Sequence, residues 1–206
     1  KGTFNLHASL LPDYRGAAPI NWAIIGGEAT TGVTTFLIDE QIDTGAILLR
    51  KEVAIALRET AGTLHDKLMT VGADLVVETL ALIASDKAVP QSQPKQVVEK
   101  PAPKIHKETS HIPWEQSLAQ IDRFVRGMSP YPTAWAQLHH EGETYAVKIY
   151  EATPQEATHN LPIGRVFLED KQIKVAVQGG FLKIESLQFP SKKRMSAREF
   201  LNGFHF

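Results

Sequence analysis

Apolar and polar positions form blocks along the first part of the chain, and each block predicts an element. Residues 33–38 are β-branched, aromatic or aliphatic and predict a buried strand, and residues 46–53 predict a second one. From Thr60 to about Ala84, apolar side chains recur at helical spacing, so we expect a long helix capped by Thr60. Two shorter elements are also expected, a strand at residues 3–6 and a helix at residues 19–25 that ends at a pair of glycines.

The composition changes at residues 89–103, where four prolines stand among Gln, Ser and Lys, which is typical of an extended linker. After this segment, a helix is predicted at residues 117–128, and a capping box of Ser196 and Glu199 predicts a last short helix. Short strands are expected at residues 134–138, 145–150, 164–167, 173–177 and 181–187. A series of short strands separated by glycines and charged turns indicates a small β-barrel or a barrel-like domain.

Composition sets wide limits on the class of protein. The chain has 206 residues, of which 43% are hydrophobic, and a formal net charge of -1, so it holds enough material for one large or two small folded domains. It has no cysteine, which excludes disulfides and thiolate ligands and favours a reducing cytoplasm. No apolar run approaches the length of a membrane span, so we expect no membrane partner. The chain starts at Lys1 without a methionine, and we expect that a preceding portion is missing.

Charge differs modestly between the two halves. Residues 1–103 carry nine Lys and Arg against twelve Asp and Glu, whereas residues 104–206 carry thirteen against eleven. The densest basic run is Lys192-Lys193-Arg194, near Arg198, and it could contact a nucleic-acid backbone. On charge alone, a solvated surface loop is the better interpretation of this run.

The most chemistry lies near the amino terminus. Asn5 and His7 are two apart in a predicted strand, so both side chains should lie on one face. The strand leads into a loop with Pro12 and Gly16, and a helix then begins at Pro19. This order is typical of the carboxyl edge of an open parallel sheet, where reactive side chains are often presented.

The acidic loop at residues 39–45 joins the two predicted strands and is a second candidate. It holds three carboxylates between apolar segments, where a buried charge is costly unless it has a partner. Taken singly, the candidates have structural interpretations: a histidine at a strand end is usually structural, and Asn and Asp-Thr-Gly are usually turn residues.

The chain resembles a known enzyme family. Residues 5–12, their continuation at 14–19, and Asp43-Thr44-Gly45 closely resemble the signature of the formyltransferases that use 10-formyltetrahydrofolate. Later segments resemble the branch of this family that acts on methionyl-tRNA. These segments are residues 104–108, 112–114, 130–132 with Trp135, and 192–201. The resemblance therefore covers nearly the whole chain.

The resemblance implies an α/β fold with two domains. Residues 1–88 would be the carboxyl-terminal half of a Rossmann-like catalytic domain, residues 89–103 a linker, and residues 104–206 an OB-like β-barrel that binds tRNA. The implied reaction moves a formyl group from 10-formyltetrahydrofolate to the α-amino group of methionyl initiator tRNA. The full-length enzyme is expected to be a cytoplasmic monomer whose product is used in translation initiation.

The resemblance also implies roles for individual residues. Asn5 and a protonated His7 would stabilise the oxyanion of the tetrahedral intermediate, His7 would move the proton, and Asp43 would orient the ring. The loop that follows would form a wall of the folate pocket, and its residues are Ser9, Leu10, Leu11 and Pro12. The chemistry needs no metal, and the other histidines, His139 and His140 included, lack a ligand constellation.

Two departures and two alternatives qualify this interpretation. Gln41 stands where the family has glycine, and the first part of the catalytic domain is absent, so we expect little activity from these 206 residues alone. One alternative is a folate-dependent formyltransferase that acts on an amino-sugar nucleotide. The other is an inert half-domain attached to an RNA-binding barrel. Arg15 could be either a surface ion-pair partner or a contact to the tRNA acceptor end.

Overall fold

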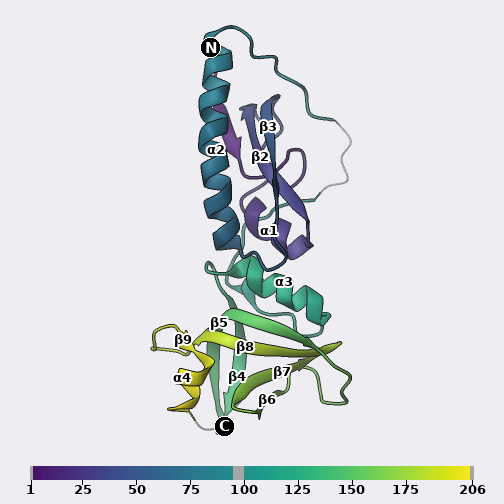
Figure 1. Cartoon of the computed structure of the whole chain (residues 1–206), viewed down its shortest axis with the longest axis vertical. Coiled ribbons are helices and arrows are strands. Elements are labelled where there is room, and N and C mark those ends of the chain that lie inside the picture. Colours follow the sequence, from purple (N-terminus) through teal and green to yellow (C-terminus); the bar gives the residue numbers. More distant parts are fainter. Residues whose placement is uncertain (1, 95–99, 205–206) are drawn as a thin grey trace. The chain divides into compact units, whose positions relative to one another are not determined.

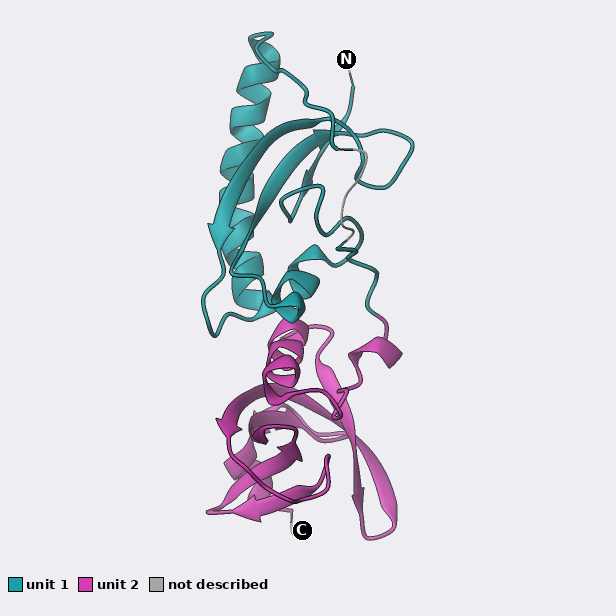
Figure 2. Cartoon of the chain, turned by 90° about the vertical axis from the view of Figure 1, so that its right-hand side faces the viewer, with its two compact units in different colours: residues 1–105 teal, residues 106–206 magenta. Residues whose placement is uncertain are grey.

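The structure is a computed structural model that describes residues 2–94 and 100–204. The chain divides into two compact units, residues 1–105 and residues 106–206, which are coloured separately in Figure 2. The first unit is a small sheet with two helices, and the second is a larger sheet with two helices and a short 3-10 turn at Glu108–Ser110. Both units are therefore mixed helix and sheet.

The sheet of the first unit has three strands in the order β1 (Phe4–His7), β2 (Thr30–Leu37) and β3 (Ile47–Ala54). Both pairings are antiparallel, with His7 opposite Thr34 in the first. The expectation of a parallel sheet edge after β1 is therefore wrong for these strands. The acidic loop closes a hairpin between β2 and β3, and a hairpin makes its two strands antiparallel.

Helix α2 (Ala61–Ala84) covers one face of this sheet, as Figure 1 shows. Thr60 caps it as predicted, in a capping box with Thr63. Its buried side chains Leu64, Leu68 and Leu75 form a core with Val33 and Val53 of the strands. Ile24 of helix α1 (Pro19–Gly26) belongs to the same core. Helix α1 ends at Gly27 in the left-handed conformation, as the glycine pair predicted.

The other face of the sheet has a smaller apolar cluster. Leu11, from the loop after β1, is fully buried against Phe36 of β2 and Ile47 of β3. This contact draws the loop over the face that does not meet α2. The loop therefore lies beside the acidic hairpin.

The segment predicted to be a linker makes specific contacts with the first unit. Gln91 and Ile47 exchange two backbone hydrogen bonds of 2.8 Å, and the Ala102 N–H donates to the Arg15 carbonyl at 2.8 Å. Residues 95–99 lie outside the described residues. The described residues on either side of them run along the acidic hairpin and the loop after β1.

The second unit is built on one six-stranded antiparallel sheet (Figure 1). Its strands are β4 (Ala134–His140), β5 (Glu143–Glu156), β6 (Val166–Glu169), β7 (Gln172–Val177), β8 (Gly180–Gln188) and β9 (Met195–Ser196). The order is β4-β5-β8-β7-β6, and β9 pairs with β8. The pairing of β5 with β8 shifts register near Glu151, and such bulges bend a long strand, so β5 can curl the sheet.

Helix α3 (Leu118–Met128) packs on the curled sheet, and α4 (Ala197–Leu201) follows β9. Ser117 and Ser196 begin these helices with capping boxes, as predicted for Ser196. None of the helices within residues 2–94 and 100–204 combines the length and apolar composition needed to cross a bilayer.

Candidate active site

Strand β1 places Asn5 and His7 on the face of the sheet that does not meet α2. Leu6 lies between them in sequence and packs against the α2 cluster, so its two neighbours must face the other way. Asn5 is exposed, and its amide has no hydrogen-bond partner among the described residues. His7 is buried and touches Phe36 edge to face, with 6.4 Å between the ring centroids. Asn5 and His7 therefore share one face of the sheet, as predicted. The Asn5 amide on this face is exposed, and the His7 ring beside it is buried.

Both ring nitrogens of His7 face groups of this chain. Nε2 lies 2.8 Å from the Tyr14 carbonyl, and Nδ1 lies 3.6 Å from Oδ2 of Asp43. A carbonyl oxygen can only accept, so Nε2 carries a proton and donates to Tyr14. Nδ1 is therefore the nitrogen that faces the carboxylate.

Asp43 reaches His7 because the acidic hairpin has a particular backbone. Asp43 has a φ of 56°, a left-handed conformation that Asp adopts more readily than most residues. At Gly45 an added Cβ would lie 1.7 Å from the Leu37 carbonyl oxygen, so only glycine fits. Asp39 holds the loop from within, because its Oδ1 accepts from the Gln41 N–H at 3.1 Å and the Thr44 hydroxyl at 2.7 Å.

The loop after β1 also binds the Asp43 carboxylate. The Gly16 N–H donates to Asp43 Oδ2 at 2.9 Å, so one carboxylate oxygen meets both a backbone donor and the His7 ring. Gly16 has a φ of 124°, and a Cβ there would lie 2.4 Å from the Ala102 carbonyl oxygen. A glycine is needed at this position for the loop to approach both Asp43 and Ala102.

The four residues predicted to line a folate pocket differ in exposure. Ser9 and Leu11 are fully buried, and the Ser9 hydroxyl donates to the Asp13 carbonyl. Leu10 and Pro12 are half-buried and present apolar surface. The inner two therefore shape the loop, and the outer two keep part of their surface exposed.

A network of charged and phenolic groups holds the far side of this loop. Oε1 of Glu28 accepts from the Tyr14 hydroxyl at 2.7 Å and from the Lys100 ammonium at 2.8 Å. Burial, helped by the hydrogen bond to Glu28, raises the pKa of Tyr14. Burial alone would raise the pKa of Glu28, but the hydrogen bonds from Lys100 and Tyr14 outweigh it and lower that pKa. The hydrogen bond to Glu28 raises the pKa of Lys100.

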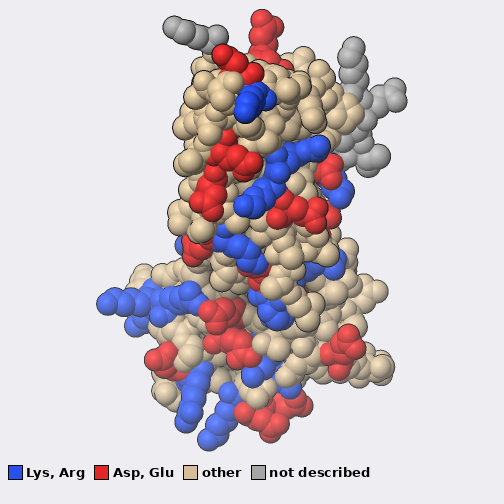
Figure 3. All heavy atoms as spheres, turned by 45° about the horizontal axis from the view of Figure 1, so that its top comes forward, with Lys and Arg blue, Asp and Glu red and all other residues tan. Residues whose placement is uncertain are grey.

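The other carboxylates of the acidic hairpin stay in solvent. Asp39 and Glu40 are exposed, whereas the Asp43 side chain is only 14% exposed. Figure 3 shows one face of the molecule, on which acidic and basic side chains are interspersed over the first unit. Burial thus sets Asp43 apart from its neighbours in the loop.

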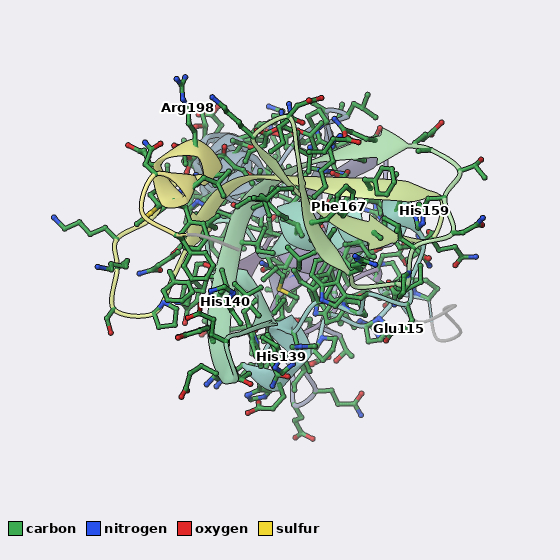
Figure 4. All side chains as sticks on the ribbon, turned by 90° about the horizontal axis from the view of Figure 1, so that it is seen from below. Glu115, His139, His140, His159, Phe167 and Arg198 are labelled. Atoms are coloured by element: carbon green, nitrogen blue, oxygen red, sulfur yellow. The ribbon has the colours of Figure 1, made fainter. Side chains whose placement is uncertain are left out.

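The remaining histidines and the apolar hollow of the second unit show no arrangement for further chemistry among the described residues. Within the described ranges, no group of three or more His, Asp or Glu side chains is arranged to hold a metal ion. Figure 4 shows His139 and His140 on β4 and His159 well apart from them. An apolar hollow in the second unit, lined by side chains such as Trp114 and Phe200, includes no titratable group in its lining.

Comparisons with known proteins show the family of this chain. The sequence model described as "Formyl transferase" matches residues 1–80, and the one described as "Formyl transferase, C-terminal domain" matches residues 104–205. The chain belongs to the formyltransferase family. It is 50% identical over 205 residues to a methionyl-tRNA formyltransferase of Flavobacterium johnsoniae, covering 100% of this chain and 65% of that protein. It is 52% identical over 209 residues to the same-named protein of Parabacteroides distasonis, covering 98% and 64%. The chain thus spans about two thirds of the length of these relatives.

Solved structures show the same fold at lower identity. HypX from Aquifex aeolicus in complex with tetrahydrofolic acid has a TM-score of 0.72 at 20% identity, covering 96% of this chain and 34% of HypX. An N-formyltransferase from Helicobacter canadensis, in complex with folinic acid and dTDP-3-aminofucose, has a TM-score of 0.66 at 19% identity, covering 93% and 66%.

In this formyltransferase chain, the basic run of the second unit splits into two kinds of residue. The Arg194 guanidinium pairs with Glu151, donates to the Ser186 hydroxyl at 2.9 Å and lies over the Tyr150 ring. Lys192 and Lys193 are exposed. Arg198 is also exposed, and Figure 4 shows it pointing outward from α4. Arg194 is thus held by its own unit, and the other cations are accessible.

The sequence did not predict that Arg15 and Gln93, which lie near Asp43, bind each other. Arg15 was left open between an ion pair and a tRNA contact, and Gln93 was placed in a linker without a role. Arg15 Nη2 donates to Oε1 of Gln93 at 2.6 Å, across 78 positions of sequence. Proline-rich composition indicates extended chain, but it carries no signal for where that chain lies.

Proposed function

We propose that this formyltransferase chain takes part in moving a formyl group from 10-formyltetrahydrofolate to the α-amino group of methionyl initiator tRNA. The observation that carries the proposal is the 50% identity to a methionyl-tRNA formyltransferase over 205 residues. The pairing of His7 with Asp43 on the same face as Asn5 supports it. The reaction forms a bond from the amine nitrogen to the formyl carbon and breaks the bond from that carbon to the folate nitrogen.

Asn5 is proposed to stabilise the negative charge that develops on the formyl oxygen. Its amide is exposed and has no partner among the described residues, so it can donate to an oxyanion without first giving up another bond. A positioned donor of this kind contributes on the order of a hundredfold or more in rate.

His7 is proposed to carry the proton from the attacking amine toward the folate nitrogen, with Asp43 orienting its ring. In the present geometry the Nε2 proton is donated to the Tyr14 carbonyl. A reacting group must therefore take the place of that carbonyl to reach Nε2. Tyr14 has a φ of 59°, a costly conformation for a bulky residue, and this strain favours displacement of its carbonyl.

The loop at Ser9, Leu10, Leu11 and Pro12 is proposed to form one wall of the folate site. Leu10 and Pro12 are half-buried apolar side chains close in sequence to His7, and flat ring systems bind against such surfaces. Ser9 and Leu11 would act by holding the loop against β2, where the Leu11 N–H donates to the Thr34 hydroxyl at 3.2 Å.

The second unit is proposed to bind the tRNA. We assign residues 1–88 to part of the catalytic domain, residues 89–103 to the linker, and residues 104–206 to an OB-like barrel that uses its exposed cations to contact phosphates. In this proposal the full-length enzyme is a monomer in the cytoplasm, where charged initiator tRNA is used.

The test uses a hybrid protein, in which this chain is joined to the part of the Flavobacterium johnsoniae relative that it does not cover. The hybrid should formylate methionyl initiator tRNA when supplied with 10-formyltetrahydrofolate. A matched hybrid with His7→Ala should lose this activity. A folded hybrid that does not formylate this tRNA would overturn the proposal.

A second candidate substrate is an amino-sugar nucleotide. The fold likeness to the Helicobacter canadensis enzyme keeps this candidate in view, although at 19% identity it concerns the fold alone. Offering the hybrid methionyl-tRNA and a dTDP-amino sugar in parallel separates the two, because the proposal requires formylation of the tRNA substrate alone.

A third candidate is an RNA-binding barrel attached to an inert half-domain. It is distinguished by the folate, because an inert first unit has no reason to bind it. Binding of tRNA by the hybrid without any binding of a folate analogue, measured by calorimetry, would favour this candidate over the enzyme.

A further inference from the structure

Gln93 lies behind the turn that presents Asp43 to His7. Its Nε2 donates to the Asp43 carbonyl at 2.9 Å and to the Gly45 carbonyl at 2.8 Å. One side chain therefore bridges the two carbonyls on either side of Thr44.

Arg15 determines which way the Gln93 amide points. A guanidinium can only donate, so the oxygen of the amide must face Arg15, where Nη2 lies 2.6 Å away. The two carbonyls can only accept, so the NH₂ group must face them. All three bonds agree on one orientation of the amide, and none of them remains if the amide flips.

The turn needs this bridge for a physical reason. Asp43 has a φ of 56°, and Gly45 lies in close contact with the Leu37 carbonyl, so the backbone here has little freedom and carries strain at Asp43. Half-buried carbonyls without donors destabilise a turn, and Gln93 satisfies both of them. Without the bridge, the Asp43 carbonyl would rotate toward water and carry the side chain with it.

The position of Asp43 matters for the site because its carboxylate makes two contacts at once. Oδ2 accepts from the Gly16 N–H at 2.9 Å and lies 3.6 Å from Nδ1 of His7. Arg15 is adjacent to Gly16, so the Arg15–Gln93 bond joins the two sides of this arrangement.

We propose that Gln93, oriented by Arg15, is a positioning residue that holds the Asp43 carboxylate against His7. The part of this inference that concerns catalysis rests on the proposed function. Gln93 touches no reacting atom in this proposal and acts through the backbone of Asp43.

The main competing explanation is that Gln93 only anchors its own segment to the first unit. The chain offers a matched control for this, because Gln91 anchors the same segment through its backbone, which exchanges two hydrogen bonds with Ile47. The Gln91 side chain is exposed, so Gln91→Ala keeps the anchor and changes the same residue type two positions away.

The first measurement uses the full chain and requires no activity. Nuclear magnetic resonance reports the Gly16 amide, whose proton is downfield and slow to exchange while it is bonded to Asp43. Gln93→Ala and Gln93→Glu should both move this signal upfield and speed its exchange severalfold, and Gln91→Ala should leave it in place. Gln93→Glu keeps the volume and an acceptor for Arg15 but loses both donors, so a role in packing alone predicts no change.

The second measurement uses the hybrid and separates kcat from KM. Both Gln93 variants should lower kcat by about 10- to 100-fold, because the catalytic pair is misplaced, while KM for folate and tRNA stays within about twofold. Arg15→Met should lower kcat less, since the amide is freed but not removed. A rise in KM for tRNA instead would make Arg15 a tRNA contact and end its role here.

The outcomes distinguish this inference from the proposed function. If the Gly16 signal is unchanged in Gln93→Glu, or changes equally in Gln91→Ala, the positioning role is overturned whatever the hybrid does. If the signal moves but kcat of an active hybrid does not, the role in catalysis is overturned. If the unaltered hybrid has no transferase activity, the proposed function fails, and the Gly16 signal still decides whether Gln93 positions Asp43. Unchanged amide signals of helix α2, which lies in the same unit as Gln93, verify in each case that this unit is folded.

Discussion

At the scale of single residues, Asp43 shows how one carboxylate of an acidic loop is drawn out of solvent while its neighbours stay exposed. Asp39 and Glu40, in the same loop, remain in solvent, and only Asp43 turns inward. The left-handed backbone at Asp43 makes this turn possible, and Asn adopts the same conformation as readily as Asp. The charge of Asp43 can therefore be tested without a change in the fold of the loop.

Asp43→Asn in the hybrid should lower kcat/KM by about 100-fold or more, because the His7 ring loses its charged partner while the Gly16 N–H keeps an acceptor. The measurement is a formylation assay with methionyl-tRNA. Glu40→Gln removes one carboxylate from the same loop and should leave the rate within twofold. Equal losses in the two variants would point to a general effect of charge and contradict a specific role for Asp43.

Gly45→Ala should destabilise the chain by about 3 kcal/mol, since the new Cβ would overlap the Leu37 carbonyl oxygen at 1.7 Å and force the hairpin apart. Chemical denaturation of the full chain measures this. Gly2→Ala meets nothing within 4 Å and is the control, with an expected change near zero. A loss below about 1 kcal/mol at Gly45 would mean that the hairpin opens freely there.

At the scale of elements, local signals were predicted well from the sequence and long-range contacts were not. Thr60 and Ser196 begin helices as predicted, because a capping box is written in residues three apart. Strand β5 extends to Glu156, well beyond the predicted end at residue 150. Pro154 and its polar neighbours do not have the pattern of a strand, and the partner strand β8 is distant in sequence. For the same reason composition could not show that Gln93 lies behind Asp43.

The site follows the same division. His7 and Asp43 were paired in advance through the order of family residues, although the sheet that carries them was wrongly expected to be parallel. The sequence pattern shows which residues form strands. The direction in which two strands pair depends on the path of the chain that connects them, which the pattern does not show. Gln41 was noted as a departure from the glycine of the family. Its φ is not positive, so the loop does not need glycine there.

The contacts of Glu28 predict a stability that depends on pH. The pKa of Glu28 is lowered in the folded chain, so its bonds stabilise the fold above its ordinary pKa of 4.5, and this contribution is lost as pH falls through the lowered value. Glu28→Gln should therefore reduce the free energy of unfolding by about 1 kcal/mol at pH 7. At a pH below the lowered value, where Glu28 is protonated in the folded and the unfolded chain, the variant and the parent should be equal.

Denaturation curves at the two pH values measure this difference for Glu28→Gln. Glu52→Gln alters an exposed carboxylate on β3 and should have little effect at either pH. A difference for Glu28→Gln that persisted in acid would show that the side chain stabilises the loop by packing, not by its charge.

Helix α3 contains an ion pair that is largely removed from solvent. Arg126 Nε donates to Oδ2 of Asp122 at 2.9 Å, and the two side chains are 11% and 9% exposed. Arg126→Met should destabilise the second unit by about 3 kcal/mol, because it leaves a buried carboxylate without this partner. Arg165→Met, at an exposed site, should change stability by less than about 0.5 kcal/mol. Similar losses at the two positions would contradict an important role for the buried pair.

At the scale of the whole molecule, the buried His7–Asp43 pair lies in one compact unit and the exposed lysines 192 and 193 lie in the other. The first unit holds His7 and Asp43 in its own core and hairpin, and its basic and acidic side chains are interspersed on the face in Figure 3. The second unit has a core of its own, and its exposed cations include Lys192 and Lys193. Arg194 belongs to the same run in sequence but is bound by Glu151, so counting charges along the chain overstates what a polyanion can reach.

If the second unit binds tRNA as proposed, binding should depend on Lys192 and Lys193, and the dependence should be visible in its response to salt. Each of Lys192→Ala and Lys193→Ala in the full chain should weaken tRNA binding and reduce the slope of log K against log salt concentration by about one, because each removes one phosphate contact. Lys87→Ala removes the same charge from the end of α2 in the first unit and should leave the slope unchanged. Equal changes in all three variants would mean that net charge alone attracts the RNA, and the exposed lysines of the second unit would then not form its binding surface.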